Sequence, residues 1–289
     1  MFKTILAPTD LSGHARDAVF RAARIAQQSG AALHLVHVQE AGIVDRLRHL
    51  VSDPPADLRS RLDAAARFGM EELAHALQQE LGVQPTLHFA EGELVAEIRG
   101  AAERTGADLV VLGARGASVA RHLLLGSTAE RLLAEATQSM LVVRTPAEVP
   151  YRDVLVPVDF SPASLAAVRR ARAIAPDARI HALHAYEAPY EGKLRQAGVE
   201  ARELRGYVQA AEKEAALQMA GLVAAGGPGI ASMLLHGHPL AHTLDQEEEL
   251  GCQLVVVGKG SGSRATDIML GSLSRRVLAQ SRVDVLMSV

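Results

Sequence analysis

The chain has 289 residues, of which 48% are hydrophobic and 22% are charged, and its formal net charge is −3 at pH 7. This length suits two domains of ordinary size. A slightly acidic chain has no general attraction for nucleic acid or for an anionic membrane surface. Aromatic residues make up only 3% and tryptophan is absent, which disfavours a stacking platform for single-stranded nucleic acid. We therefore expect neither nucleic acid nor a membrane as a partner.

The cellular compartment is indicated by the cysteine content and by the start of the chain. Cys252 is the single cysteine, so no internal disulfide can form, which suits a reducing cytoplasm. It lies in an apolar segment, and we expect it to be buried and inert. The first residues lack the apolar core of a signal peptide, and no apolar run approaches the roughly 18 residues of a membrane helix. We expect a soluble, cytoplasmic protein.

The predicted elements, taken in chain order, alternate between strands and helices. A short apolar strand (5–8) ends in proline, and Ser12 opens a helix. A strand (33–38), a long helix (57–81), a strand ending near Ala90 and a helix (94–105) follow. A strand (108–113), a helix (127–136) and a strand (139–144) complete the pattern. Such alternation predicts an α/β fold with a parallel sheet covered on both faces.

The same pattern then repeats. Four segments of the first half recur in the same order in the second: 2–12 in 151–161, 32–40 in 179–187, 106–116 in 251–261, and 123–128 in 268–273. Ser161-Pro162 opens the equivalent first helix, and the equivalent long helix is expected at 193–225. Two prolines interrupt the pattern at 145–150. We therefore expect two copies of one unit, with domains at 1–147 and 148–289.

The sequence GARGASVARHLLLGST (113–128) suggests a phosphate-binding loop. Gly113 ends the fourth strand and Asp10 follows the first, so both lie at the edge of the sheet where the strands have their carboxyl ends. Gly126 and Ser127 open a helix, whose N–H groups point to the same edge and suit an anion. The nine residues between Gly116 and Gly126 allow the chain to leave the edge and return.

This spacing resembles the nucleotide-binding pattern of the universal stress protein family: G-x-x-G, nine residues, then G-[S/T]. The resemblance extends over both copies, as in tandem members of that family. It implies a five-stranded parallel sheet of order 3-2-1-4-5 in each unit, with helices on both faces, a fold like that of adenine nucleotide alpha hydrolases. It also implies that ATP binds, with or without Mg²⁺, and that an unknown regulatory protein is the partner. The two repeats would form an internal pseudo-dimer through their fifth strands, and a homodimer of whole chains stays open.

The resemblance also assigns roles to residues of the first copy. Asp10 would accept a hydrogen bond from the ribose or adenine. Pro8 and Thr9 would line the base pocket, and Val38 and Leu112 would pack against adenine. Gly113 and Gly116 would let the backbone approach the ribose and phosphates closely, and Arg115 would offer a nearby cation. The phosphates would be bound by Gly126, Ser127, Thr128 and Ala129.

The second copy departs from this pattern at one position. Its candidate binding residues are Pro157, Val158, Asp159, Ala185, Gly258, Ser261, Gly271, Ser272, Leu273 and Ser274. Ser261 stands where the second glycine belongs, and serine is disfavoured if that position requires a positive φ. A degenerate second site and a functional one both stay open.

Local structural roles compete with binding at two of these residues. Ser127 and Glu130 match a helix capping box, S-x-x-E, which would engage the Ser127 hydroxyl. Asp10 would serve equally well as the cap of the first helix. A P-loop after the 254–258 strand is excluded because Gln253 stands where its first glycine is required, and no G-x-G-x-x-G follows the first strand.

The histidines suggest structure more than chemistry. His238 and His242 have the i, i+4 spacing of a metal pair, with His236 nearby, but the aligned residues of the first copy are glutamates, which favours a polar, exposed helix start. We therefore expect no metal site. Histidines in the second strands, namely His34, His37, His181 and His184, are expected to be satisfied core or edge residues.

The sequence predicts at most a weak ATPase. The serine, histidine and aspartate residues do not occur in an order that these strands would assemble into a catalytic triad. No acidic cluster beside the glycines marks a Mg²⁺ site. The leading hypothesis is a cytosolic, ATP-binding regulatory protein of the stress response. An adenylating or phosphoryl-transfer enzyme, and an interaction module with vestigial sites, are the alternatives.

Overall fold

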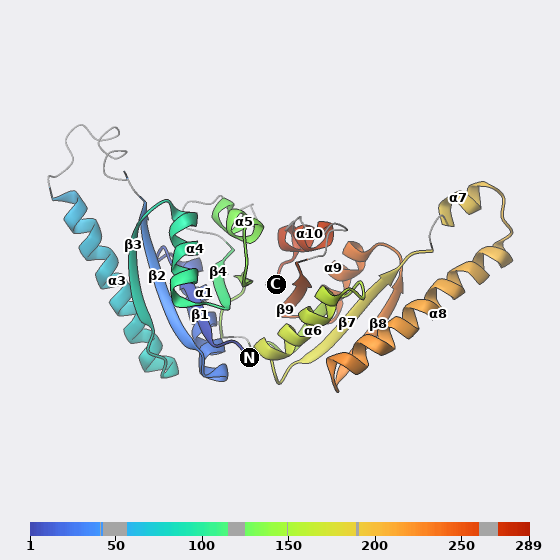
Figure 1. Cartoon of the computed structure of the whole chain (residues 1–289), viewed down its shortest axis with the longest axis horizontal. Coiled ribbons are helices and arrows are strands. Elements are labelled where there is room, and N and C mark those ends of the chain that lie inside the picture. Colours follow the sequence, from blue (N-terminus) through green and yellow to red (C-terminus); the bar gives the residue numbers. More distant parts are fainter. Residues whose placement is uncertain (41, 43–56, 115–124, 149, 189–190, 260–270) are drawn as a thin grey trace. The chain divides into compact units, whose positions relative to one another are not determined.

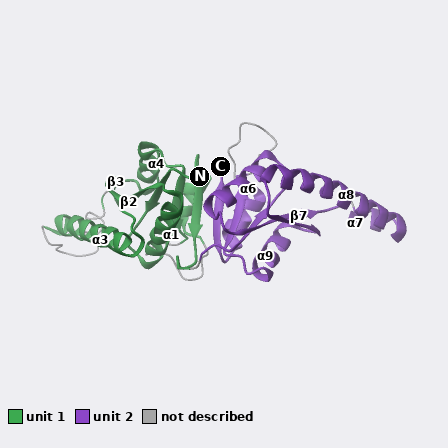
Figure 2. Ribbon diagram, turned by 90° about the horizontal axis from the view of Figure 1, so that it is seen from below, with its two compact units in different colours: residues 1–149 green, residues 150–289 purple. Residues whose placement is uncertain are grey.

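The computed structural model describes residues 1–40, 42, 57–114, 125–148, 150–188, 191–259 and 271–289. The chain consists of two compact units, Met1–Val149 (unit 1) and Pro150–Val289 (unit 2), shown in green and purple in Figure 2. Both units alternate strands with helices, which confirms the predicted repeated α/β architecture. Of the described helices, none is both long and apolar enough to span a membrane.

Unit 1 follows the predicted order of elements closely. Its strands are β1 (Thr4–Pro8), β2 (Ala32–Glu40), β3 (Thr86–Gly92), β4 (Leu109–Gly113) and β5 (Ser139–Val143). Its helices are α1 (Gly13–Ser29), α3 (Leu58–Leu81), α4 (Leu94–Thr105) and α5 (Ser127–Ala134).

Unit 2 repeats this order, and its described residues also include a short helix, α7, between β7 and α8. Its strands are β6 (Asp153–Pro157), β7 (Arg179–Tyr186), β8 (Ile230–His236), β9 (Leu254–Gly258) and β10 (Asp284–Ser288). Its helices are α6 (Pro162–Ile174), α7 (Glu191–Gln196), α8 (Ala201–Gly226), α9 (Pro239–Glu249) and α10 (Ser272–Gln280).

Each unit has a parallel sheet of the predicted order. In unit 1 the strands lie β3-β2-β1-β4-β5, and in unit 2 they lie β8-β7-β6-β9-β10, which is the 3-2-1-4-5 order counted within each repeat. Strand β1 pairs with β2 through Ile5–Leu33 and with β4 through Ile5–Leu109, so the strand order reverses between β1 and β4. Open α/β sheets bind ligands at such a reversal, beyond the carboxyl ends of the strands.

Helices cover both faces of each sheet (Figure 1). In unit 1, α1 contacts α3 and α4 contacts α5, and in unit 2, α6 contacts α8 and α9 contacts α10. The central strands are therefore buried on both sides, as their unbroken apolar runs predict: every residue of Leu109–Leu112 and of Leu254–Val257 is buried. The loops that follow the strands therefore begin at the edges of two well-packed sheets.

The first helices of the two units begin in the same way. Ser12 caps α1 by accepting a hydrogen bond from the Ala15 N–H, and Ser161 caps α6 by accepting one from the Ser164 N–H. Pro162 occupies the first position of α6, where a missing N–H has no cost. The predicted starts of both helices are confirmed.

The single long helix predicted at 193–225 is wrong, because the structure has two helices there. Helix α7 ends at Gln196, and α8 begins at Ala201. Gly198 lies between them with φ +79°, a left-handed conformation that glycine adopts easily, and the N–H of Val199 bonds back to the Leu194 carbonyl. This is a helix C-terminal turn that the alanine- and glutamate-rich sequence obscured.

Candidate functional site

A cavity of 740 Å³ opens at the carboxyl edge of the sheet in unit 1. Its walls come from the ends of β1, β2 and β4, from the start of α5, and from the sides of α3 and α4. Cavities of roughly 300–1,000 Å³ are typical of small-molecule sites. It therefore has the size and the place expected of a ligand site in this fold.

Ten of the residues predicted for the first site line this cavity together. They are Pro8, Thr9, Asp10, Val38, Leu112, Gly113, Gly126, Ser127, Thr128 and Ala129. Arg115 and Gly116, the remaining two, lie outside the described residues. Segments far apart in the sequence thus converge on one space, although their part in binding stays a prediction.

The sequence reasoning missed most of the apolar wall. Beyond Val38 and Leu112, that wall is formed by Leu11, Ala15, Val36, Leu62, Ala65, Ala66, Leu94, Ile98 and Leu132. For the part of the wall that comes from α3 and α4, helical periodicity indicates inward-facing positions such as Ala66 and Ile98. It does not distinguish a side chain that faces packed core from one that faces a cavity.

The amino terminus of α5 supplies hydrogen-bond donors to the cavity. In the described part of the chain, the N–H groups of Ser127, Thr128 and Ala129 have no partner, and the first helical bond runs from the Glu130 N–H to the Gly126 carbonyl. Such N–H groups, together with the helix dipole, favour an anion. The described lining residues include no lysine or arginine, so among them the backbone is the main attraction for an anion.

The predicted capping box at Ser127 is wrong by one position. Gly126 is the cap residue, with φ −84° and ψ 152°, and it provides no side chain, while Ser127 is the first residue of the helix. A hydroxyl at the first helical position does not reach back to the N–H groups that a cap residue satisfies. Ser127 is exposed and presents its hydroxyl beside these N–H groups.

The loop after β1 is held in a strained conformation. Leu11 has φ +63°, which is rare for a bulky side chain. The loop is fixed by the N–H of Ser12, which donates to the Asp10 Oδ1 at 3.0 Å, and by the N–H of Leu11, which donates to the Thr9 Oγ1 at 3.0 Å. Asp10 is therefore not the helix cap, since Ser12 has that role. The Asp10 carboxylate stays at the cavity, where it can accept from a ligand donor.

The histidines of the second strands are satisfied, as predicted, and one of them also lines the cavity. His37 bonds through Nδ1 to the Thr9 carbonyl at 2.9 Å, and His184 of unit 2 does the same with the Val158 carbonyl at 2.8 Å. His34 bonds to His88, and His181 bonds to Asp153, each at 2.9 Å. His37 thus fixes the junction between β1 and β2 at the cavity wall.

The candidate residues of unit 2 lie at the equivalent edge of the second sheet. The ends of β6, β7 and β9 and the first turn of α10 carry Pro157, Val158, Asp159, Ala185, Gly258, Gly271, Ser272, Leu273 and Ser274. Ser261 lies outside the described residues. The repeat therefore brings all the other second-copy residues to one edge.

Two features of this second edge have local structural causes. A Cβ on Gly258 would lie 3.0 Å from the Ala163 carbonyl oxygen, so the close approach of α6 by itself favours glycine there. Burial raises the pKa of the Asp159 carboxyl, but hydrogen bonds from Ser161 and Ser164 outweigh it and hold the pKa below its usual value. Asp159 is thus already stabilised as a carboxylate by its own loop and helix.

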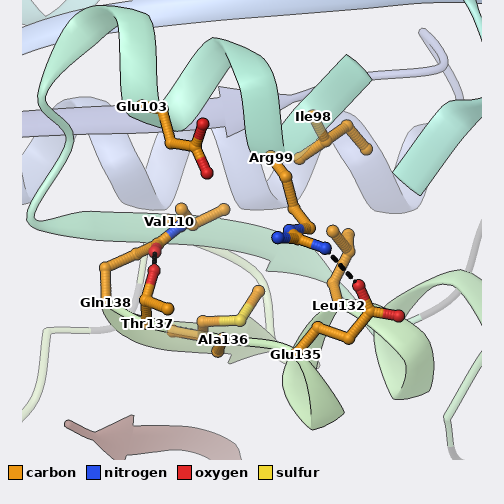
Figure 3. A pocket seen from close by; sticks show the side chains of 10 residues that line it. Ile98, Arg99, Glu103, Val110, Leu132, Glu135, Ala136, Thr137 and Gln138 are labelled. Carbon is orange, nitrogen blue, oxygen red and sulfur yellow. Dashed lines mark hydrogen bonds and ion pairs between the residues drawn. The ribbon is translucent and has the colours of Figure 1, made fainter. Parts of the chain in front are cut away.

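A second cavity in unit 1 is too small for a ligand (Figure 3). It holds about 10 Å³ between α4, α5 and the strands β4 and β5, which is room for at most one water molecule. Arg99 pairs with Glu135 at its rim, and the Thr137 hydroxyl donates to the Gln138 side chain, as the dashed lines in Figure 3 mark. These polar groups form hydrogen bonds with one another and are not arranged around a ligand.

The histidines considered for a metal have structural partners instead. The i, i+4 spacing of His238 and His242 suggested that they share a helical face. They do not, because His238 is the cap of α9 and accepts a hydrogen bond from the Leu240 N–H. His242 bonds to the His236 carbonyl, and His236 bonds to Glu191. Among the residues that the structure describes, no group of three or more histidine, cysteine or acidic side chains is placed to hold a metal ion. Cys252 is buried, and burial raises its pKa to about 12.

Comparison with known proteins gives the same family for both repeats. The family model described as universal stress protein family matches residues 1–144 and 150–288. Universal stress protein G of Escherichia coli O157:H7 is 31% identical over 148 residues, which cover 50% of this chain and 100% of that protein. A universal stress protein of Thermus aquaticus is 35% identical over 145 residues, again 50% of this chain and 100% of its own length.

The fold of the whole chain, with both repeats, also occurs among solved structures. The crystal structure of a universal stress protein from Archaeoglobus fulgidus DSM 4304 aligns with a TM-score of 0.68 and 20% identity, covering 99% of this chain and 97% of the other. At this identity the match supports the fold alone. The single-repeat relatives, by contrast, are each matched along their whole length.

Proposed function

This chain belongs to the universal stress protein family, and from that premise we propose that unit 1 binds ATP in the cavity at its sheet edge. The bound nucleotide would make the chain a cytosolic regulator of the stress response. The observation that carries the proposal is the convergence of an apolar wall, an acceptor carboxylate and unpartnered helix N–H groups on one cavity of 740 Å³.

The chemistry of the cavity matches the three parts of a nucleotide. Val38 and Leu112 provide an apolar surface for a planar base, and the carboxylate of Asp10 is an acceptor for ribose hydroxyls. The N–H groups at the start of α5 suit the phosphates. A ligand without an anionic group would leave those donors unused, and one without an apolar ring would leave the wall hydrated.

Regulation fits the cavity better than catalysis. His37, the titratable ring among the described lining residues, is engaged with the Thr9 carbonyl through Nδ1 and serves to fix the wall. Nucleotide binding would shift the population of a form that a protein partner recognises, by as much as the two forms differ in their affinity for ATP. ATP hydrolysis, where present, would be slow.

Isothermal titration of the full chain with ATP, with and without MgCl₂, tests the proposal. We expect saturable binding in the micromolar to low millimolar range, with GTP and inorganic phosphate binding more weakly. The same samples are then incubated and analysed for ADP by chromatography. No binding at millimolar ATP contradicts the proposal, and multiple-turnover release of ADP would favour the enzyme alternative.

A further inference from the structure

Three positions that line the cavity of unit 1 have different residues in unit 2. Leu11, Ala15 and Ala129 line the unit 1 cavity. Their equivalents are Phe160, Ser164 and Ser274, placed by the repeat at the same points of the fold. Leu11 and Phe160 share a left-handed backbone, with φ +63° and +62°.

The equivalence is clearest at Ala15 and Ser164. Each is the third residue of its helix, α1 or α6, and each donates its N–H to the hydroxyl of the capping serine at 3.3 Å. The backbone geometry is thus the same in the two units. What differs is the side chain, a methyl group in unit 1 and a hydroxyl in unit 2.

The Ser164 hydroxyl bridges the loop that carries Asp159. It donates to the Asp159 Oδ1 at 2.6 Å and accepts from the Asp159 N–H at 2.9 Å. The N–H of Ser161 donates to the same Oδ1 at 3.0 Å. Two donors of the protein therefore converge on the carboxylate oxygen, and a ligand hydroxyl must displace one of them or use the other oxygen.

Ser274 makes a similar internal bond at the other side of the edge. It is the third residue of α10, in the position of Ala129 in α5, and is 6% exposed. Its hydroxyl donates to the Gly258 carbonyl at 2.7 Å. This bond ties the first turn of α10 to the end of β9, where a phosphate chain would otherwise pass close to both.

Phe160 adds bulk where unit 1 has Leu11. Its ring lies 4.2 Å, between centroids, from the ring of His184, with the two planes tilted by 38°. His184 is the equivalent of His37, which lines the unit 1 cavity. The aromatic pair therefore lies where Leu11 and His37 form part of the cavity wall in unit 1.

We infer that unit 2 is closed by its own side chains, because Phe160 packs beside His184, Ser164 engages the Asp159 carboxylate and Ser274 ties α10 to β9, and that the chain binds one nucleotide, in unit 1. This rests on the proposed function of unit 1. The asymmetry has its cause in these three substitutions and not in Ser261 alone.

Exchanging the three residues between the units tests this inference. The opened variant carries Phe160→Leu, Ser164→Ala and Ser274→Ala, and the closed variant carries Leu11→Phe, Ala15→Ser and Ala129→Ser. The number of ATP molecules per chain is measured by native mass spectrometry and by equilibrium dialysis. Thermal unfolding and circular dichroism verify that each variant is folded, and Ser261→Gly alone serves as the matched comparison.

The wild-type chain is expected to bind one ATP and the opened variant two. The closed variant is expected to bind roughly tenfold or more weakly, as the blocking of one or two hydrogen-bonding positions predicts. Two ATP molecules on the wild-type chain, a second one gained by Ser261→Gly alone, or a folded opened variant that still binds one would each overturn the inference. A wild-type chain that binds none refutes the proposed function itself, so the two failures are distinct.

Discussion

At the scale of single residues, the glycines of the edge are required by space more than by backbone conformation. Gly126 and Gly271, the cap residues of α5 and α10, have φ −84° and −56°, values open to any residue. Gly258 is needed because Ala163 approaches it closely. A larger side chain at Gly126 or Gly271 should therefore fill space without straining the backbone, whereas one at Gly258 would press on the Ala163 carbonyl.

Gly126→Val is expected to abolish tight ATP binding while leaving unit 1 folded. Gly126 is buried at the cavity, so the added methyl groups would occupy the path of the phosphates, at a cost of about 1–3 kcal/mol, or roughly a 5- to 150-fold loss of affinity. Titration calorimetry measures the loss. Gly221→Val, in α8, where an added Cβ meets nothing within 4 Å, is the control and should bind as the wild type does. Unchanged affinity in Gly126→Val would mean that the phosphates do not pass this residue.

A second residue-scale prediction concerns Asp153, which is buried at the start of β6. Its carboxylate accepts from Arg179 and His181, each at 2.9 Å. Burial raises its pKa, but these hydrogen bonds outweigh it, so the pKa in the folded state lies below the ordinary value of 3.8. A lowered carboxyl pKa stabilises the fold above the pKa of the unfolded state, and this contribution is lost as the pH falls through the lower, folded value.

Asp153→Asn is therefore expected to lower the free energy of unfolding by about 1–3 kcal/mol at pH 7. The difference from wild type should shrink as the pH falls below 3.8, the ordinary value that applies to the unfolded chain, and towards the lower pKa of the folded state. Urea titrations at pH 7, 4 and 3 measure it. Asp63→Asn, at an exposed position of α3, is the control. A difference that grows toward acid would contradict the assigned direction of the pKa.

At the scale of elements, the amino terminus of α5 is the feature on which the proposed phosphate binding depends. Its first residue, Ser127, offers both a hydroxyl and an N–H group. Proline is tolerated at the first position of a helix, as Pro162 in α6 and Pro239 in α9 illustrate, and the extended backbone of Gly126 suits a following proline. The two groups can therefore be removed separately without breaking the helix.

Ser127→Ala removes the hydroxyl alone, and Ser127→Pro removes the N–H as well. We expect the proline variant to bind ATP more weakly than the alanine variant by about 1.5–3 kcal/mol, the range for a hydrogen bond to a charged group. Calorimetric titration of both variants, with thermal unfolding to compare their stabilities, gives this difference. Equal affinities would show that the N–H of Ser127 does not contact the ligand.

The order of elements was predictable because strands buried on both faces and helices with strong caps leave clear patterns. Errors arose where one residue decides the outcome. Gly198 ends a helix inside a sequence rich in helix formers. At Ser127 the capping box pattern was off by one position, because Gly126 can serve as the cap without a side chain. Neither the helix end at Gly198 nor the cap at Gly126 can be predicted from the hydrophobic periodicity of the sequence.

At the scale of the whole molecule, the repeat made the site predictable and also hid its asymmetry. Collinear matches place the glycines and both aspartates at equivalent edges, and the structure brings the described ones of unit 1 to one cavity. The apolar wall from α3 and α4 was missed, since inward-facing residues look alike whether they meet a core or a cavity. Ser164 was missed because its effect depends on a hydrogen bond to Asp159 that only coordinates reveal.

Photolabelling of the full chain with 8-azido-ATP, followed by peptide mapping, tests the central claim most directly. The account predicts that the label falls on peptides of unit 1 that line the cavity, from β1, β2 and the start of α5. It also predicts that excess ATP prevents the labelling. Label that ATP displaces from unit 2 peptides, or the absence of any labelling that ATP displaces, would contradict the account.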